Sequence, residues 1–266
     1  MKLRLLYFFL ILCICAISCT SKKEKLSKEI YLLETSDSSS SQAGMGKLAD
    51  KYFEYYSNFP KDSISEVYLY KAYMYKYLTS DFNSALSYSA KYLSYYGKTE
   101  NFYNICLKKA DIFKSAIVNI DSAVYYYLLC EDKIQFSSNE YRNAAQTIEK
   151  WANTIKSSDS LKIANTLFSA AKFYHLCTDF EKAAKLYSDI ALQFPRFSKS
   201  PQALSSSAFI FWNELKNASM AKEIYQILIK NFPESTESKE AKVILNEKML
   251  EMTDEQLSEY LLNKNK

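Results

Sequence analysis

Three cysteines lie close together near the start of the chain, and their thiols are the first candidates for chemistry in the sequence. Cys13, Cys15 and Cys19 stand at the end of an apolar run over 5–17 that follows two positive charges. The run is shorter than the roughly 20 residues that a helix needs to cross a bilayer. With its positive start, it predicts a secretory signal. Cleavage requires a small residue before the cut, and of the three cysteines only Cys19 follows one, Ser18.

Residues 16–19, Ala-Ile-Ser-Cys, resemble the bacterial lipobox, in which the cysteine is acylated and becomes the new N-terminus. Ala16 stands where that motif usually has leucine. The resemblance implies three acyl chains on Cys19, and two or more chains give stable membrane attachment. We therefore expect a lipoprotein signal peptide over 1–18, with an uncleaved anchor or a plain secretory signal as the alternatives. Because no aspartate follows Cys19, the resemblance favours the outer membrane and its periplasmic face, with the cell surface as the alternative.

The rest of the chain shows no recognisable catalytic or metal-binding motif. His175 is the one histidine, so no histidine metal cluster and no H-E-x-x-H motif can form. Cys106, Cys130 and Cys177 form no C-x-x-C pair. We expect a protein that is not an enzyme and has no metal or cofactor. A disulfide between Cys106 and Cys130 is a hypothesis for an oxidising compartment, and two buried thiols are the favoured interpretation.

The composition indicates an all-α protein. The 266 residues include only 3 glycines and 4 prolines, whereas strand-and-turn folds need such residues at their tight turns. Removing Lys2 and Arg4 with the signal leaves 32 of the 34 basic residues against 30 acidic ones. Nucleic-acid-binding domains are clearly basic, so we expect no nucleic-acid partner.

A serine-rich stretch precedes the body of the chain. Residues 35–46, TSDSSSSQAGMG, hold a single charge and two of the three glycines, a composition typical of flexible linkers. Ahead of it, Leu26, Ile30 and Leu33 would share one face of a short helix. We expect Cys19 and a flexible tether over 19–46, followed by a folded body from Lys47.

The body contains an internal repeat. The segment 179–195, DFEKAAKLYSDIALQFP, aligns with 217–233, NASMAKEIYQILIKNFP, so that Pro195 and Pro233 stand 38 residues apart. Ala85 and Ala123 have the same spacing. A period of this length is typical of stacked helix–turn–helix repeats, in which each hairpin buries its apolar face against its neighbours.

This pattern resembles the tetratricopeptide repeat (TPR) family, in which small residues lie where the two helices cross and a proline follows the second helix. Bulky side chains would hold closely crossing helices apart, and proline cannot donate the next backbone hydrogen bond. The best match, over 164–195, has Ala171, Tyr174, Ala183, Tyr187 and Pro195 at these places. In the unit that ends at Pro233, Ala208, Ala221 and Tyr225 occupy the same places. Two earlier units have the small residues Ala72 and Ala85, and Ala110 and Ala123, but lack the proline. The resemblance implies an all-α, TPR-like α-solenoid of antiparallel helix hairpins over 47–252.

Two parts of the body depart from the repeat. The spacing between Ala123 and Ala183 exceeds one period, so 161–177 could be either the first or the second helix of a hairpin. We expect a change in superhelix curvature between 137 and 160. Near the end, 237–251 should form a capping helix with Ala241, Ile244 and Leu245 facing inward, followed by a tail helix over 253–266.

The TPR resemblance also implies a partner-binding face, because the family binds peptides or partner helices along a concave surface lined by first helices. Aromatic and cationic side chains are frequent interface anchors, although an aromatic stripe on a helix is more often core. Tyr70, Tyr73 and Tyr77 form such a stripe at i, i+3 and i+7. The other positions carried over from the family are Lys76, Asp111, Lys114, Lys172, His175, Phe209 and Trp212.

Taken together, the lipobox, the chain length and the Phe-Pro hairpin ends resemble the BamD family of outer-membrane assembly lipoproteins. They also resemble the periplasmic TPR proteins of the Tol–Pal system. The resemblance implies a membrane-anchored, non-catalytic scaffold that binds envelope proteins or peptides in β-barrel assembly or envelope maintenance. Glycan capture, as in SusD-like lipoproteins, is the alternative from another class, although this chain lacks their long inserted loops. An enzyme of unrecognised type is the third.

Overall fold

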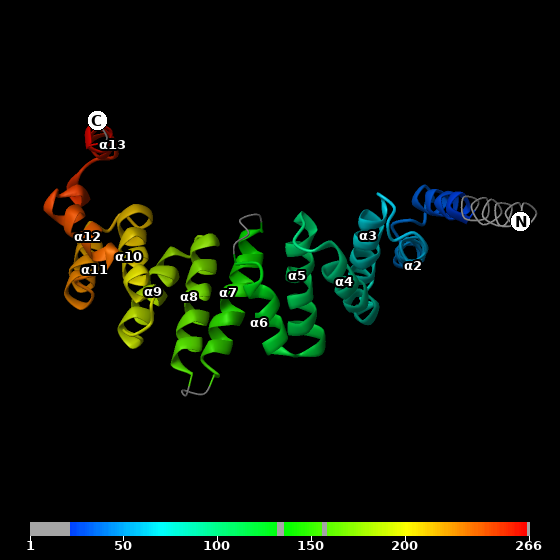
Figure 1. The fold of residues 1–266 in the computed structure, drawn as a ribbon, viewed down its shortest axis with the longest axis horizontal. Coiled ribbons are helices and arrows are strands. Elements are labelled where there is room, and N and C mark those ends of the chain that lie inside the picture. The colour runs from blue at the N-terminus through cyan, green and yellow to red at the C-terminus, as the bar shows by residue number, and fades with distance from the viewer. Residues whose placement is uncertain (1–21, 132–135, 156–158, 265–266) are drawn as a thin grey trace, which may run out of the picture. The chain divides into compact units, whose positions relative to one another are not determined.

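The computed structural model describes residues 22–131, 136–155 and 159–264. Within these ranges every regular element is a helix (Figure 1), which confirms the all-α class. The chain divides into two compact units, 1–118 and 119–266, which we call unit 1 and unit 2. From α2 to α5 in unit 1 and from α6 to α12 in unit 2, helices that follow one another in sequence pack against one another. Cys19 and the expected signal over 1–18 lie outside the described residues.

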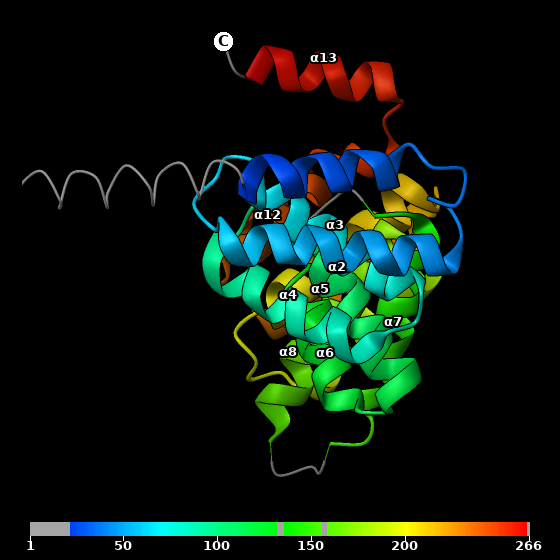
Figure 2. The same cartoon turned by 90° about the vertical axis from the view of Figure 1, so that its right-hand side faces the viewer.

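Unit 1 begins with the helical residues 22–34, which lie along α2 (Figure 2). Its further elements are α2 (Gln42–Asn58), α3 (Ser65–Leu78), α4 (Phe82–Tyr96), α5 (Glu100–Ile112) and the π-helical turn η1 (Phe113–Ile117).

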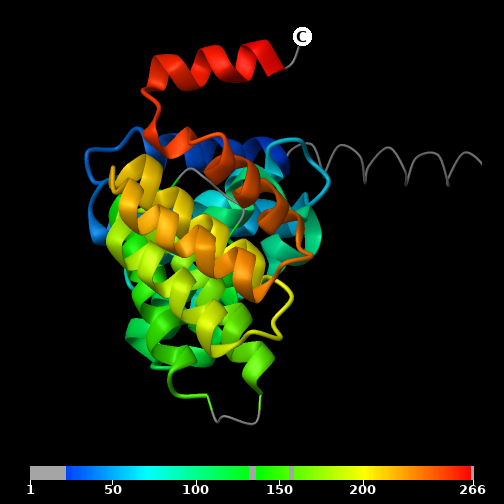
Figure 3. The same ribbon diagram turned by 90° about the vertical axis from the view of Figure 1, so that its left-hand side faces the viewer.

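Unit 2 ends in a tail helix that stands off from the preceding helices (Figures 1 and 3). Its elements are α6 (Ile120–Leu128), α7 (Ser138–Ala152), α8 (Ser160–Leu176), α9 (Phe180–Gln193), α10 (Ser200–Phe209), the π-helical turn η2 (Ile210–Glu214), α11 (Ala218–Asn231), α12 (Thr236–Asn246), the 3-10 turn η3 (Met249–Glu251) and the tail α13 (Asp254–Lys264).

Small residues lie where the paired helices cross, as a TPR-like hairpin requires. Six alanines expected at crossings within one unit have no exposed surface: Ala72, Ala85, Ala171, Ala183, Ala208 and Ala221. Ala110 of unit 1 and Ala123 of unit 2, expected at a further crossing, have no exposed surface either. A larger side chain at these places would separate the two helices. The TPR-like architecture of the hairpins is therefore confirmed on the chain's own packing.

Four of the connections between helices have the same type of turn. In each, a residue with positive φ follows one helix, and an aspartate or asparagine comes next as the N-cap of the following helix. The residues with positive φ are Ser80 (61°), Val118 (57°), Thr178 (61°) and Lys216 (50°). Because the Thr178 turn joins α8 to α9, α8 is the first helix of that hairpin, which decides between the two interpretations of 161–177. The helix α7 packs on α8 as well and is the additional helix that interrupts the repeat. The expected change in curvature stays a prediction.

A buried serine follows each Phe-Pro turn. The second helices α2, α9 and α11 end on such turns, and the serine six residues after each phenylalanine has no exposed surface. Ser65 Oγ donates to the Phe59 carbonyl at 2.5 Å, and Ser200 Oγ donates to the Phe194 carbonyl at 2.7 Å. Ser238 Oγ donates to a carbonyl one turn earlier, at 3.0 Å. Each hydroxyl thus joins the start of one hairpin to the end of the previous one.

The N-terminal part of unit 1 corrects the expectation of a flexible tether for residues 22–46, whereas residues 19–21 lie outside the described residues. Leu26 and Ile30 have exposed fractions of 4% and 0% and pack against residues of α2. The helix α2 begins at Gln42 rather than Lys47, with the Ser41 hydroxyl accepting a hydrogen bond from the Gly44 amide. A Cβ on Gly44 would lie 1.9 Å from a backbone carbonyl oxygen of the preceding turn, so glycine is needed for this close approach. The serines act as caps of packed helices.

The C-terminal part of unit 2 is more divided than expected. The helix α12 ends at Asn246 instead of continuing to Glu251, because Lys248 has a positive φ of 53° and a 3-10 turn follows. Ala241 has no exposed surface, whereas Ile244 and Leu245 are half-buried. The tail helix starts at a reciprocal cap, in which the Thr253 amide donates to Gln256 and the Gln256 amide donates to Thr253.

Candidate functional site

Tyr73, expected on the partner-binding face, is a core residue of unit 1. It has no exposed surface, and its hydroxyl donates to the Ile105 carbonyl at 3.4 Å. Burial raises its pKa well above 10, so the hydroxyl stays protonated. Because α3 packs between α2 and α4 and Tyr73 reaches α5, this side chain is not available to a partner, which corrects the prediction.

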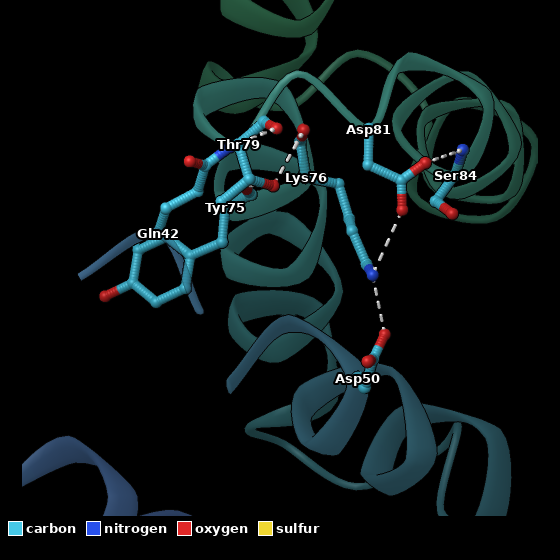
Figure 4. A network of polar contacts seen from close by, with 7 residues as sticks. All are labelled: Gln42, Asp50, Tyr75, Lys76, Thr79, Asp81 and Ser84. Atoms are coloured by element: carbon cyan, nitrogen blue, oxygen red, sulfur yellow. Dashed lines mark hydrogen bonds and ion pairs between the residues drawn. The ribbon is translucent and has the colours of Figure 1, made fainter. Parts of the chain in front are cut away.

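Lys76 is also a structural residue (Figure 4). Its exposed fraction is 8%, and its Nζ lies 2.7 Å from Asp50 Oδ1 and 3.2 Å from Asp81 Oδ2. Burial acts to lower the pKa of Lys76, but the hydrogen bonds to Asp50 and Asp81 outweigh it and raise that pKa. Lys76 therefore holds α3 against α2 and against the turn before α4, and the prediction of partner contact is corrected here too.

Tyr70 and Tyr77 complete the expected stripe and are half-buried. The Tyr70 hydroxyl accepts a hydrogen bond from Asn104 Nδ2 at 2.9 Å, and Lys108 Nζ lies 5.8 Å from the centre of the Tyr77 ring. Both contacts join α3 to α5. The stripe therefore serves mainly to pack helix against helix.

Three more predicted residues, Asp111, Lys114 and Lys172, are half-buried. Asp111 and Lys114 stand near the junction of α5 and η1. Lys172 of α8 forms an ion pair with Glu131 at 3.8 Å, and Glu131 also accepts a hydrogen bond from Ser169. Lys172 thus has a partner within unit 2.

The last three predicted residues come together in unit 2. His175, Phe209 and Trp212 all line one cleft of about 530 Å³. Phe209 is 45% exposed, and His175 and Trp212 are half-buried. The other lining residues are Tyr187, Ser205, Ser206, Ile210, Tyr225, Glu240, Ile244, Met249 and Leu257. The first helices α8 and α10 thus supply His175 and Phe209, η2 supplies Trp212, and α12, η3 and α13 supply further walls.

The π-helical turn η2 gives the cleft its aromatic edge. The helix α10 widens at Ile210, and the Leu215 amide donates to the Ile210 carbonyl at 3.0 Å. A π-turn holds an extra residue and is frequent at functional sites. Trp212 lines the cleft, whereas Phe211, one residue earlier, lines a separate cleft of about 560 Å³ between α9 and α11. Sequence reasoning missed this turn because no residue type in it signals the extra residue.

A smaller cleft of about 220 Å³ adjoins the cleft that His175 lines. Within this adjoining pair, we call the cleft lined by His175 the larger cleft. Phe209, Trp212 and Leu257 line both. The smaller cleft also includes Lys216 and Asp254. Leu257 belongs to the tail helix α13, so one side chain of the tail reaches the edge of both clefts.

The chemistry of the larger cleft suits binding of apolar side chains. Its walls are mostly aromatic and aliphatic, with the hydroxyls of Ser205 and Ser206 and the carboxylate of Glu240 among them. Such a lining binds apolar groups and uses a few polar atoms to orient them. Burial, together with the Glu240 charge, raises the pKa of Tyr225 to about 12, so this hydroxyl stays neutral. Among the described residues, no group of three or more His, Cys, Asp or Glu could hold a metal ion.

The remaining candidates for chemistry are buried. Cys106, Cys130 and Cys177 are buried thiols, in agreement with the favoured interpretation. No helix within the described ranges is long and apolar enough to cross a membrane.

Comparisons with known proteins add little to this description. No model of a known protein family matches the chain, and no curated protein matches it. Among solved structures, the chain is similar to a tetratricopeptide repeat protein from Parabacteroides merdae ATCC 43184. The identity is 11%, the match covers 90% of this chain and 97% of that one, and the TM-score is 0.39. The assignment of a TPR-like fold therefore rests on the crossing alanines and hairpin turns of the chain itself.

Proposed function

We propose that this chain is a non-catalytic TPR scaffold that is anchored to the bacterial envelope through acylated Cys19 and binds a protein partner in the larger of the two adjoining clefts of unit 2, the one lined by His175. The cleft supports the proposal because it gathers Phe209, Trp212 and His175 on one accessible surface. The lipobox resemblance supports the anchor, and it favours the periplasmic face of the outer membrane. The likeness to the BamD and Tol–Pal proteins supports a role in β-barrel assembly or envelope maintenance.

The partner that this cleft fits is a segment with apolar side chains. Phe209 keeps 45% of its surface exposed, and covering an apolar side chain completely is worth about 1.5–3 kcal/mol. Aromatic anchors in central pockets carry most of the binding energy of a typical protein interface. Phe209 and Trp212 are therefore the residues we expect to dominate affinity.

Photocrosslinking in cells tests the proposal with a matched pair of positions. Benzoylphenylalanine replaces Phe209 in the cleft, or Tyr125 on the outer side of α6 as the control. Tyr125 is 59% exposed and is also aromatic, so the two probes differ mainly in location. We expect discrete protein adducts from position 209 and not from position 125. Mass spectrometry then identifies the partner.

Three results separate the alternatives. Barrel-assembly or Tol–Pal components in the adduct would support the envelope roles named above. Glycan adducts without protein would replace the scaffold by a glycan-binding protein. Equal adduct patterns from positions 209 and 125 would show that the cleft is not the binding site.

A further inference from the structure

The helical residues 22–34 are held firmly on unit 1 along their whole length. Leu26 and Ile30 face the core. At the start of the segment, Lys22 Nζ donates to Asn58 Oδ1 at 2.5 Å and Lys23 forms an ion pair with Asp62. Further along the segment, Glu29 pairs with Lys51 at 2.8 Å, and Glu34 accepts hydrogen bonds from Lys71 Nζ at 2.9 Å and Tyr52 at 2.5 Å.

This packing places unit 1 next to its proposed anchor. Only two residues separate Cys19 from Lys22. Even fully extended, their Cα atoms can lie at most about 11 Å apart. If Cys19 is acylated as proposed above, the N-terminal end of this helix must therefore lie within the headgroup region or directly beside it.

The face of the helix that points away from unit 1 carries side chains suited to a lipid surface. Lys25 and Lys28 are exposed, and Tyr31 and Leu32 have exposed fractions of 63% and 58%. Positions 25, 28 and 32 lie on one stripe of a helix. Lysines attract anionic headgroups, and tyrosine and leucine bind at the boundary between headgroups and acyl chains. Glu24 is the acidic residue on this side.

We propose that this outward face, Lys25, Lys28, Tyr31 and Leu32, is a membrane-contact surface for an anionic phospholipid leaflet. The inference rests on the proposed acylation of Cys19. It replaces the expected flexible tether by a rigid attachment, in which the acyl chains bring the helix to the leaflet and the basic, partly apolar face contacts it.

The test uses the full acylated protein in vesicles of phosphatidylethanolamine and phosphatidylglycerol. A polarity-sensitive fluorophore is attached through Leu32→Cys on the proposed surface, or through Ser115→Cys as the matched control. Ser115 is exposed and lies in η1, which follows α5, the last α-helix of unit 1. The natural thiols at 106, 130 and 177 are buried. Vesicle flotation measures attachment, and a nitroxide on the lipid headgroup measures proximity.

We expect the protein to float and the label at position 32 to be quenched several-fold more strongly than the label at 115. Reversing two charges, with Lys25→Glu and Lys28→Glu, should weaken the quenching at 32 without preventing flotation. Flotation with equal quenching at 32 and 115 would overturn the membrane-contact surface and leave the anchor intact. Loss of flotation in the unchanged protein would overturn the anchor and, with it, this surface.

Discussion

The packing of residues 22–34 makes a sharp prediction for Ile30→Ala. Ile30 has no exposed surface and belongs to the cluster that contains Leu48, Tyr52 and Ala72. Its replacement removes buried methyl groups from the interface between this helix and α2. A flexible tether would tolerate the same change without effect.

The expected loss follows from the burial. Ile→Ala in a protein core costs about 2–5 kcal/mol, depending on how far the site collapses. The helix covers only one side of unit 1 and can shift toward α2, so we place the loss of unfolding free energy at about 2–3 kcal/mol. With a urea dependence of about 2 kcal/mol per molar, the unfolding midpoint should fall by about 1–1.5 M.

Urea unfolding followed by circular dichroism measures this loss, and Leu32→Ala is the matched control. Leu32 is on the same helix but is 58% exposed, so its midpoint should stay within about 0.3 M of the unchanged protein. Equal midpoints for Ile30→Ala and the unchanged protein would refute the packed helix. The membrane-contact surface would then lose its structural basis.

Three further predictions concern the rest of the chain. Ser200→Ala should lower the unfolding free energy by about 0.5–1.5 kcal/mol, because it removes the hydrogen bond from the Ser200 hydroxyl to the Phe194 carbonyl, which keeps its bond from the Phe197 amide. Ser198→Ala, at an exposed position, should change urea stability little. Alkali should destabilise unit 1, because burial and Glu66 raise the pKa of Tyr92 from 10 to about 12. The stability that protonated Tyr92 contributes to the fold is complete below pH 10 and is lost as pH rises toward 12. A urea midpoint that falls over this pH range would measure the loss. In a variant that lacks the other tryptophan, Leu257→Ser should shift the fluorescence emission of Trp212 to longer wavelength, because Leu257 lines both clefts together with that indole. Unchanged emission would show that the tail helix does not cover Trp212.

The repeat itself could be predicted from sequence because it depends on side-chain size. Where two helices cross closely, only a small residue fits, whatever surrounds it. Ala171 and Ala183 were identified on this ground, and both have no exposed surface. The Phe-Pro turn was recognised by its proline, whereas the buried Ser200 that completes it was overlooked because serine is common in loops as well.

The flexible tether was mispredicted because amino-acid composition describes a segment as a whole and does not show what each residue does at its own position. Residues 35–46 are rich in serine and contain Gly44, which is typical of a linker. In the structure Ser41 caps α2, and Gly44 lies where a carbonyl passes too close for any Cβ. The apolar face formed by Leu26 and Ile30 was visible in the sequence. It needed a packing partner, Tyr52, that lies beyond the serines.

The residues predicted to bind a partner are accessible only where the helices leave a surface open. A position carried over from the TPR family specifies where a residue lies in the hairpin, but it does not specify how exposed that side chain is. Tyr73 and Lys76 of α3 have neighbours on several sides, so an aromatic ring and an ammonium group there serve packing and ion pairing. Phe209 has the corresponding chemistry and remains exposed.

The larger cleft exists because unit 2 departs from a regular helix at two places. At η2 the extra residue of a π-turn separates Trp212 from Phe211, so the two rings line different clefts. At Lys248 a left-handed residue ends the capping helix early, and the following Met249 then forms a wall of the larger cleft. A continuous helix over 237–251 would carry Met249 onward along the axis of α12. Functional surfaces often lie where local sequence rules fail, and here neither departure is marked by glycine or proline. The place of the hairpin could therefore be read from the sequence, whereas the cleft could not.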